Sequence, residues 1–248
     1  MRLCMTLTER QRDILKSLET NRKISVNKLA KQLYVSEATI RRDLSEMQTM
    51  GLIERRHGGA VLPENSEEVS IFFRMERNAI EKERVATKAL LHVPPFKSVF
   101  VDSSSTALAL AQRLDLSYKT VVTNNLQTAI LLSKKNNVNL IVLGGNVSFN
   151  NNSSTGTWTA RQLEDFSFDL MLTSCAAVHS GATYERSIEQ KEIKKVAFLH
   201  CQKKMLLVDH TKFNAFGTYR LTSLTDYDFV VTDVEPQDAD NKNIRYIY

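Results

Sequence analysis

The sequence predicts an α+β protein with two domains: a small helical domain with a β-hairpin, then an α/β domain with a mainly parallel sheet. Its 248 residues are enough for two domains. Apolar residues recur at helical spacing over residues 8–50, whereas short apolar runs alternate with helical segments from residue 98 onward. The basic excess is confined to one end, because residues 1–62 hold twelve basic and seven acidic side chains and residues 63–248 hold 21 of each. This asymmetry predicts a basic domain that contacts a polyanion.

Composition restricts the class of protein further. A hydrophobic fraction of 42% with 25% charged residues is typical of a globular chain and argues against disorder. No apolar run approaches the roughly 18 residues of a membrane span, and the N-terminus lacks a signal-peptide core. Cys4, Cys175 and Cys201 have no spacing that predicts a disulfide framework or a zinc site. We therefore expect a cytoplasmic protein with no membrane partner, metal or cofactor.

Three helices are expected within residues 8–50. Thr8 can cap the first, with Gln11 three residues later completing a capping box. The second covers about residues 26–33 and has one apolar face, and the third follows the capping residue Ser36. Gly51 is a natural stop for the third helix.

A β-hairpin follows these helices. Leu52–Arg55 and Ala60–Leu62 are short apolar segments on either side of a turn at residues 56–59. A helix, a tight turn, a second helix and an added hairpin make up a winged helix-turn-helix. We expect residues 1–62 to form this DNA-binding domain, residues 63–70 to be a linker, and residues 71–248 to form the α/β domain.

The third helix of this arrangement presents its outward N-terminal face to the major groove, and the hairpin tip lies along the phosphate backbone. Arginines on such a face reach phosphate or guanine. The predicted DNA contacts are therefore Ser36, Glu37, Ala38, Thr39, Arg41, Arg42, Arg55, Arg56, His57 and Gly58. Asp43 is instead expected to hold an arginine or a helix terminus, because phosphates repel it.

Tyr34 conflicts with this arrangement. Helix-turn-helix turns often place glycine at its position, and a tyrosine with positive φ costs roughly 1–2 kcal/mol. Either the turn is of another type or the domain tolerates the strain.

Two motifs carry a resemblance to a known family. Residues 35–44 read VSEATIRRDL and residues 57–60 read HGGA, and together they closely resemble the DNA-binding domain of the DeoR/GlpR family of bacterial sugar-metabolism regulators. The resemblance extends to about residue 234. It implies an operator-binding repressor of a carbohydrate operon, modulated by a phosphorylated sugar or sugar alcohol, and not an enzyme.

The second half alternates strands and helices after an amphipathic helix expected at residues 71–92. Continuous apolar strands of this kind are typical of a parallel sheet covered on both faces. The expected strands are 98–101, 120–122, 138–143, 168–173, 205–208 and 229–232, and the expected helices lie near 107–114, 125–133, 158–165 and 187–200.

Ligands of open parallel sheets bind at the carboxyl ends of the strands. Hydroxyl residues follow the first strand and lead into a helix, whose N-terminus favours phosphate. Asn124 follows the second strand, glycines end the third, and Lys212 supplies a positive charge. The candidate effector site is Asp102, Ser103, Ser105, Thr106, Asn124, Gly144, Gly145 and Lys212. The serines have a simpler alternative role in capping the helix.

The same half resembles the family's effector domain, whose fold is similar to that of ribose-5-phosphate isomerase. The resemblance puts all of these candidates except Ser103 at ligand-binding positions, but the pattern also shows departures. Ser104 stands where glycine is usual, and Ala176 and Ala177 replace residues that bind the sugar. A glutamate expected near the start of the 187–200 helix is either Glu189 or has become Gln190. The ligand is therefore different, weakly bound or lost.

Two alternatives remain beside the sensor interpretation. The α/β domain is a scaffold without ligand, or the chain is a sugar-phosphate isomerase with a DNA-binding appendage. The isomerase would need a general base, for which Asp102, Asp209 and Glu189 are the plausible carboxylates. Because one DNA-binding domain reads only a few base pairs, we also expect a homodimer or higher even oligomer, assembled through the second domain.

Overall fold

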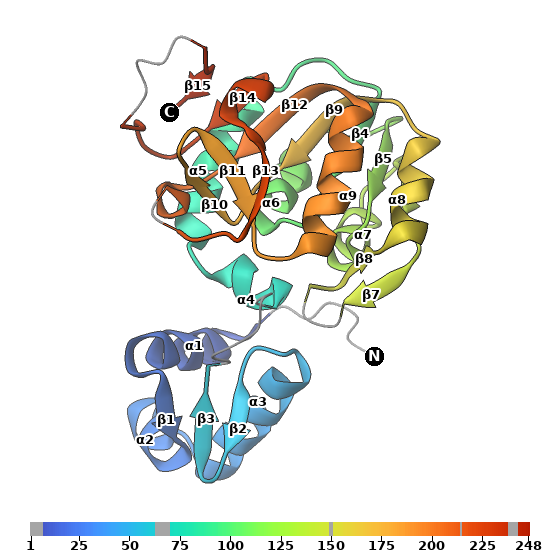
Figure 1. The fold of residues 1–248 in the computed structure, drawn as a ribbon. Coiled ribbons are helices and arrows are strands. Elements are labelled where there is room, and N and C mark those ends of the chain that lie inside the picture. The colour runs from blue at the N-terminus through green and yellow to red at the C-terminus, as the bar shows by residue number, and fades with distance from the viewer. Residues whose placement is uncertain (1–6, 63–69, 149–150, 214, 238–242) are drawn as a thin grey trace. The chain divides into compact units, whose positions relative to one another are not determined.

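The computed structural model of the chain contains two compact units, which divide between Glu76 and Arg77 (Figure 1). It describes residues 7–62, 70–148, 151–213, 215–237 and 243–248. The linker expected at residues 63–70 lies outside the described residues except for Ser70, and Cys4 also lies outside them.

The first unit is a winged helix-turn-helix, as predicted. Its helices are α1 (Glu9–Asn21), α2 (Val26–Gln32), α3 (Glu37–Thr49) and α4 (Ile71–Glu76), and its strands are β1 (Lys23–Ser25), β2 (Glu54–Arg56) and β3 (Gly59–Val61). Thr8 and Gln11 form the expected capping box, and Ser36 caps α3. The strands pair antiparallel in the order β1-β3-β2. The sequence did not predict β1, because Ile24 is its single apolar residue within a polar segment.

Apolar faces of all four helices form the core of this unit, which includes Ile14, Leu29, Ile40, Leu44, Met47, Ile71, Phe72 and Phe73. The expected continuous helix at residues 71–92 is wrong. Asn78 adopts a left-handed conformation with φ of +52° and separates α4 from α5 (Ala79–Leu90). Because the apolar side chains of α4 pack into the first core, the units divide at Glu76, later than the boundary placed at residues 63–70.

Close pairing of two strands explains why the HGGA motif has its second glycine, Gly59. A β-carbon at this position would lie 2.2 Å from the carbonyl oxygen of Ile24 on β1. The strands can therefore pair this closely only if residue 59 has no side chain.

The second unit is an α/β domain built on a seven-stranded sheet in the order β15-β14-β12-β9-β4-β5-β6, with every pair parallel. The strands are β4 (Ser98–Val101), β5 (Thr120–Thr123), β6 (Asn139–Val142), β9 (Phe168–Thr173), β12 (Cys201–Leu207), β14 (Phe229–Val231) and β15 (Tyr246–Ile247). The helices are α5, α6 (Ser105–Arg113), α7 (Leu126–Leu132), α8 (Thr157–Glu164) and α9 (Ile188–Leu199). The predicted parallel sheet is therefore confirmed.

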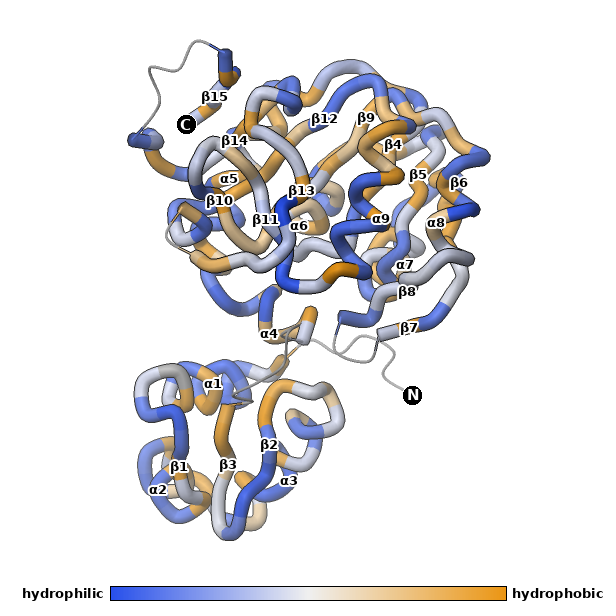
Figure 2. Tube along the Cα trace, viewed as in Figure 1, coloured by the Kyte–Doolittle hydropathy of each residue, from blue (hydrophilic) through white to orange (hydrophobic). Residues whose placement is uncertain are grey.

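Helices cover both faces of this sheet. Val99 and Val101 of β4 pack in one core with side chains of α5 and α6, whereas Phe100 packs on the other face with side chains of α8 and α9. Figure 2 shows the central strands β4 and β9 as largely hydrophobic. Burial on both faces is why these strands read as continuous apolar runs.

Besides the edge strand β15, three features of this unit went unpredicted. A three-stranded antiparallel sheet is formed by β10 (Ala177–His179), β11 (Ala182–Glu185) and β13 (Tyr219–Ser223), and a hairpin by β7 (Asn146–Ser148) and β8 (Ser153–Thr155). Two 3-10 turns, η1 (His210–Lys212) and η2 (Leu224–Asp226), follow β12 and β13. Ser153 and Ser154, which follow a run of asparagines, belong to β8. The described helices include none that is both long and apolar enough to span a membrane.

Candidate functional site

The outward face of α3 is exposed because its other face forms the core of the first unit. Ile40, Leu44 and Met47 are fully buried. The Ser36 hydroxyl accepts a hydrogen bond from the backbone N–H of Thr39 at 3.2 Å and so fixes the start of the helix. The predicted contact residues Ser36, Ala38, Arg41 and Arg42 are exposed, and Glu37 and Thr39 are half-buried.

Arg41 is paired along its own helix. Its guanidinium donates to the Glu37 carboxylate at 2.6 Å, one turn away, and Glu37 also accepts a bond from Asn27 at 3.2 Å. Exposed ion pairs of this kind contribute only about 0–1 kcal/mol. The Arg41 guanidinium can therefore leave Glu37 for a phosphate or a base at little cost.

The wing places further cations at the edge of this unit. Arg55 donates to the carbonyl oxygen of Arg41 at 3.5 Å, which joins the wing to α3. Arg56 pairs with Glu54 at 2.9 Å, while His57 and Gly58 occupy the exposed tip between β2 and β3. Three further predicted contacts are therefore on the surface: Arg56, His57 and Gly58.

Asp43 holds an arginine, as expected, and does not face solvent. Its buried carboxylate accepts two hydrogen bonds from Arg10, at 2.5 and 3.1 Å. The hydrogen bond to Asp43 raises the pKa of Arg10 above its ordinary value. This pair joins α1 to α3 and fixes the orientation of the recognition helix.

Asp102 is the centre of a buried network in the second unit. One carboxylate oxygen accepts from the backbone N–H of Ser104 at 2.8 Å. The other accepts from the Thr173 hydroxyl at 2.6 Å and the backbone N–H of Ser174 at 3.2 Å, and lies 3.1 Å from the Lys194 ammonium. Asp102 therefore joins the carboxyl ends of β4 and β9.

Lys194 binds two carboxylates at once. Its ammonium lies 2.6 Å from Glu185 as well as near Asp102, and it donates to the Ser174 carbonyl at 2.7 Å. Burial alone would raise the pKa of Asp102, but the charge of Lys194 and the hydrogen bonds lower it overall. Burial outweighs Lys194 at Glu185 and raises its pKa. Burial also disfavours the charged form of Lys194, but its two carboxylates raise its pKa overall. All three side chains are buried.

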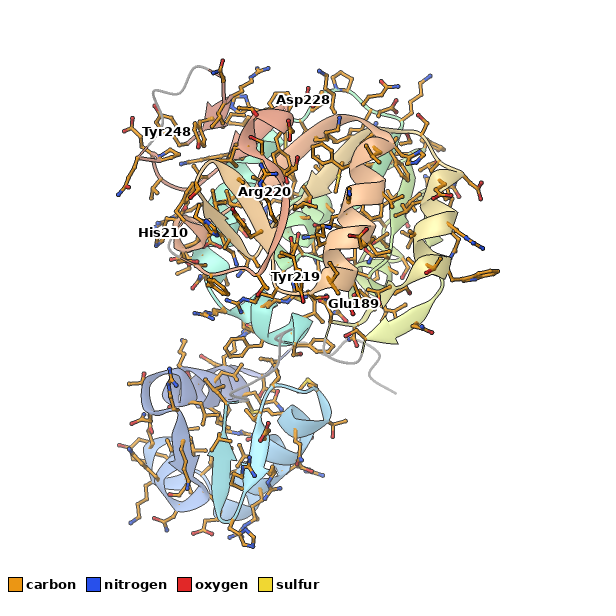
Figure 3. The ribbon with its side chains drawn as sticks, viewed as in Figure 1. Glu189, His210, Tyr219, Arg220, Asp228 and Tyr248 are labelled. Carbon is orange, nitrogen blue, oxygen red and sulfur yellow. The ribbon has the colours of Figure 1, made fainter. Side chains whose placement is uncertain are left out.

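Gln190, not Glu189, faces the serine loop. Its amide oxygen accepts from the Ser103 hydroxyl at 2.8 Å, and its amide nitrogen donates to the Ser153 hydroxyl at 2.8 Å. Glu189 is exposed and accepts from Ser187 at 2.7 Å, and Figure 3 labels it at the start of α9. The position that faces the loop therefore carries a neutral amide.

The remaining serines of the loop are also buried, together with Thr106. The Ser104 hydroxyl caps α6 by accepting from the backbone N–H of Ala107 at 3.2 Å. This is the capping role that the sequence left open.

Two buried oxygen atoms lack a hydrogen-bond partner among the described residues: Oδ1 of Asn124 and Oδ2 of Asp209. The Asn124 amide nitrogen donates to the Ser154 carbonyl at 2.9 Å, so the side chain is fixed while its oxygen is unpaired. The other carboxylate oxygen of Asp209 accepts from the backbone N–H of Thr211 at 3.1 Å. Both residues follow a strand at its carboxyl end, as expected for ligand-binding groups.

Lys212 lies in the same loop as Asp209 and is half-buried. Burial raises the pKa of Glu185, and the charge of Lys212 offsets a small part of that rise.

Gly144 and Gly145 are exposed and are explained by contacts within the protein. The Gly144 carbonyl accepts from Thr159 at 2.8 Å and from Gln162 at 3.0 Å, both on α8. A β-carbon at Gly145 would lie 2.0 Å from the Thr159 hydroxyl. These glycines allow α8 to approach the end of β6.

Cys175 and Cys201 are free and buried. Burial raises the pKa of each thiol to about 12, so both are protonated and poor nucleophiles at neutral pH. Within the described residues no group of three or more His, Cys, Asp or Glu side chains is arranged to hold a metal ion.

The sequence interpretation missed Lys194 and Glu185. Their detectable sign was the position of Lys194 on the buried face of α9, at helical spacing with Gln190, Ile193 and Ala197. A cation on an apolar face requires a buried partner. The strand that carries Glu185 was not predicted, so its partner was not apparent.

A winged helix-turn-helix joined to an α/β domain with buried polar groups at its strand ends is the architecture of a ligand-responsive transcriptional regulator. Residues 10–66 match the DeoR-like helix-turn-helix domain, and residues 77–234 match the DeoR C terminal sensor domain. The chain belongs to the DeoR family.

Several regulators are similar over most of the chain. The HTH-type transcriptional regulator GolR of Listeria innocua is 37% identical over 91% of this chain and 90% of that protein. The glycerol-3-phosphate regulon repressor of Escherichia coli is 31% identical over 94% and 93%. The L-fucose operon activator of Escherichia coli is 29% identical over 90% and 94%. Among solved structures, ribose 5-phosphate isomerase A of Methanocaldococcus jannaschii covers 55% of each chain at 14% identity with a TM-score of 0.40, too distant to bear on function.

Proposed function

We propose that this protein is a cytoplasmic repressor of a carbohydrate-metabolism operon, modulated by a phosphorylated sugar or sugar alcohol. The observation that carries this proposal is the exposed basic face of α3, anchored by its buried apolar face within a winged helix-turn-helix. Relatives named as a glycerol-3-phosphate regulon repressor and an L-fucose operon activator support control of sugar genes. The activator makes positive control the second candidate.

For DNA, we propose that α3 enters the major groove and that the wing follows the phosphate backbone. The proposed contacts are Ser36, Glu37, Ala38, Thr39, Arg41, Arg42, Arg55, Arg56, His57 and Gly58. A homodimer or higher even oligomer, assembled through the second unit, would present two such helices to repeated half-sites.

For the effector, we propose that the loop 102–106 and Lys212 bind a phosphate and that Asn124 contacts hydroxyl groups. The unpaired buried oxygens of Asn124 and Asp209 support a ligand rich in hydroxyl donors, because such atoms are costly to leave without a partner. The proposed site keeps Asp102, Ser103, Ser105, Thr106, Asn124, Gly144, Gly145 and Lys212, and adds Asp209. A scaffold domain without ligand remains the alternative.

The isomerase alternative has less support. Asp102 is buried, accepts hydrogen bonds from three groups and is paired with Lys194, so it is poorly placed to take a proton from a substrate. Glu189 is exposed and bonded to Ser187. These contacts disfavour Asp102 and Glu189 as general bases. Asp209 has a carboxylate oxygen without a partner among the described residues, so the isomerase alternative depends on this residue alone.

The DNA half is tested with the DNA fragment upstream of this protein's own gene. Fluorescence anisotropy should show saturable binding that weakens as salt increases. Arg41→Ala and Arg42→Ala should each cost about 1–3 kcal/mol if a base contact is lost, without lowering thermal stability. Unchanged affinity in the double variant would refute the proposed docking face.

The effector half is tested by thermal shift with glycerol 3-phosphate and a panel of pentose and hexose phosphates. A ligand at about one hundred times its Kd stabilises the protein by about 2.7 kcal/mol. Lys212→Ala should abolish that shift, whereas Lys195→Ala, an exposed lysine on α9, should retain it. No shift with any compound would favour the scaffold alternative.

A further inference from the structure

Tyr34 stands in a strained conformation in the turn between α2 and α3. Its φ is +53°, in the left-handed region that favours glycine. The backbone N–H of Val35 donates to the Ala30 carbonyl at 3.1 Å, which is the hydrogen bond of a helix C-terminus with a left-handed residue after the cap. The strain that the sequence left open is therefore present.

The fold gains no burial in return for this strain. The Tyr34 side chain is 94% exposed. The first core is formed without it, by side chains of the helices and strands on either side of the turn. Glycine would adopt the same conformation without strain. Strained residues persist where the surrounding structure fixes them, and they cluster at functional sites.

The position of Tyr34 suggests what it contacts. It lies two residues before Ser36, the cap of α3, so it precedes the face that carries the proposed base contacts. A residue just before a helix that occupies the groove is set back from the bases and faces the sugar–phosphate backbone at the groove edge. Tyrosine hydroxyls are established donors to phosphate oxygens.

We propose that Tyr34 donates its phenolic hydroxyl to a phosphate oxygen of the DNA backbone beside the groove that α3 occupies. This inference rests on the proposed DNA-binding function and adds a contact that positions α3. The donor is neutral, so its bond releases no counterion and leaves the salt dependence of binding unchanged. The bond reads no base, so it strengthens binding to all sequences by the same factor.

The test measures binding of the full-length protein to two duplexes, the fragment upstream of its gene and a random-sequence duplex at low salt. Tyr34→Phe removes only the hydroxyl and should weaken binding to both duplexes about tenfold or more, since tenfold is close to the lower limit for a hydrogen bond to a charged group. The slope of log affinity against log salt should not change. Arg56→Ala, on the exposed wing that is proposed to follow the phosphate backbone, is the contrast, because loss of a phosphate-neutralising cation lowers that slope by about one.

A second variant separates binding from folding. Tyr34→Gly relieves the strain, so it should raise the thermal unfolding midpoint by a few degrees while weakening DNA binding as much as Tyr34→Phe does. The chain offers a matched control in Tyr118, a tyrosine with φ of +60° that is 87% exposed in the other unit. Tyr118→Gly should also raise the midpoint but leave DNA binding unchanged.

Every other outcome contradicts either the inference about Tyr34 or the proposed function on which it rests. If Tyr34→Phe binds both duplexes like the unaltered protein, the hydroxyl makes no contact, whatever partner the ring has. If Tyr34→Phe loses affinity for the upstream fragment alone, the contact is to a base. If the unaltered protein binds neither duplex, the proposed function fails instead, which distinguishes the two failures.

Discussion

The recognition face of α3 and the buried network around Asp102 differ in how they hold their charged groups. Arg41 and Glu37 form an exposed pair on one helix, and their side chains are 57% and 41% exposed. Lys194 and Asp102 come from different elements and are 5% and 1% exposed. The first pair can exchange partners with water or DNA, whereas the second cannot separate without leaving a charge buried.

In the first unit the exposed charged groups contribute little to stability, whereas in the second unit the buried charged groups are needed for it. Exposed charges contribute little to folding, so the DNA-binding face can change its specificity without unfolding its domain. A buried pair is costly to break, because removal of one partner leaves the other unpaired in a low-dielectric interior. Substitutions within the buried network of the second unit should therefore lower the stability of that unit.

The largest expected effect is at Lys194. Lys194→Ala leaves Asp102 and Glu185 buried without their shared cation, so the free energy of unfolding of the second unit should fall by about 3–5 kcal/mol. Urea denaturation followed by circular dichroism measures this loss. The double variant Lys194→Met with Glu185→Gln should recover part of it, because fewer charges remain buried.

Lys195 provides the control on the same helix. It is the next residue along α9 but is exposed. Lys195→Ala should change the free energy of unfolding by no more than about 0.5 kcal/mol. Equal effects at the two lysines would show that the buried network does not stabilise the domain, and the comparison between the units would fail.

The next largest effect is expected at Gly59, a buried position on which the stability of the DNA-binding unit depends. Gly59→Ala would place a β-carbon 2.2 Å from the Ile24 carbonyl, so β1 and β3 must separate and stability should fall by about 1–3 kcal/mol. Gly58, next to it at the wing tip, has a φ of +72°, and a β-carbon added there would meet no atom within 4 Å. Gly58→Ala should therefore cost about 1 kcal/mol through strain alone. Thermal unfolding of the two variants measures the difference.

The exposed face of the first unit was predictable because its chemistry is local. Capping residues, helical spacing and the VSEATIRRDL segment all lie within a few turns of one another, so Arg41 and Arg42 could be placed on an outward face from sequence alone. Continuous apolar runs likewise predicted six of the seven parallel strands, but not β15. Asn78 was not predictable, because the split between α4 and α5 arises from packing of Phe72 and Phe73 into the first core.

The network of the second unit depends on contacts between residues distant in the sequence. Asp102 and Lys194 are 92 positions apart and meet only when α9 packs on the sheet. The small antiparallel sheet that carries Glu185 was missed because its strands are only three to five residues long and mix apolar with polar residues. The sequence alone also could not show whether Glu189 or Gln190 faces the serine loop. The orientation of α9 about its own axis places Gln190 there.

The smallest expected effect tests whether exposed pairs behave alike in both units. His210, labelled in Figure 3 on the loop after β12, lies 2.8 Å from Asp233, and this hydrogen bond raises the pKa of His210 above its ordinary value. Stabilisation by a raised histidine pKa is complete below about pH 6.5 and is lost as pH rises through the folded-state pKa. Because the imidazole is 47% exposed, the loss should be a few tenths of a kcal/mol, as for exposed pairs elsewhere.

An NMR titration should show the raised pKa of His210. Asp233→Asn, which keeps an acceptor for the His210 backbone N–H, should return that pKa toward the ordinary value. A loss of several kcal/mol would mean that this pair belongs with the buried network and that exposure does not decide how charges contribute to stability.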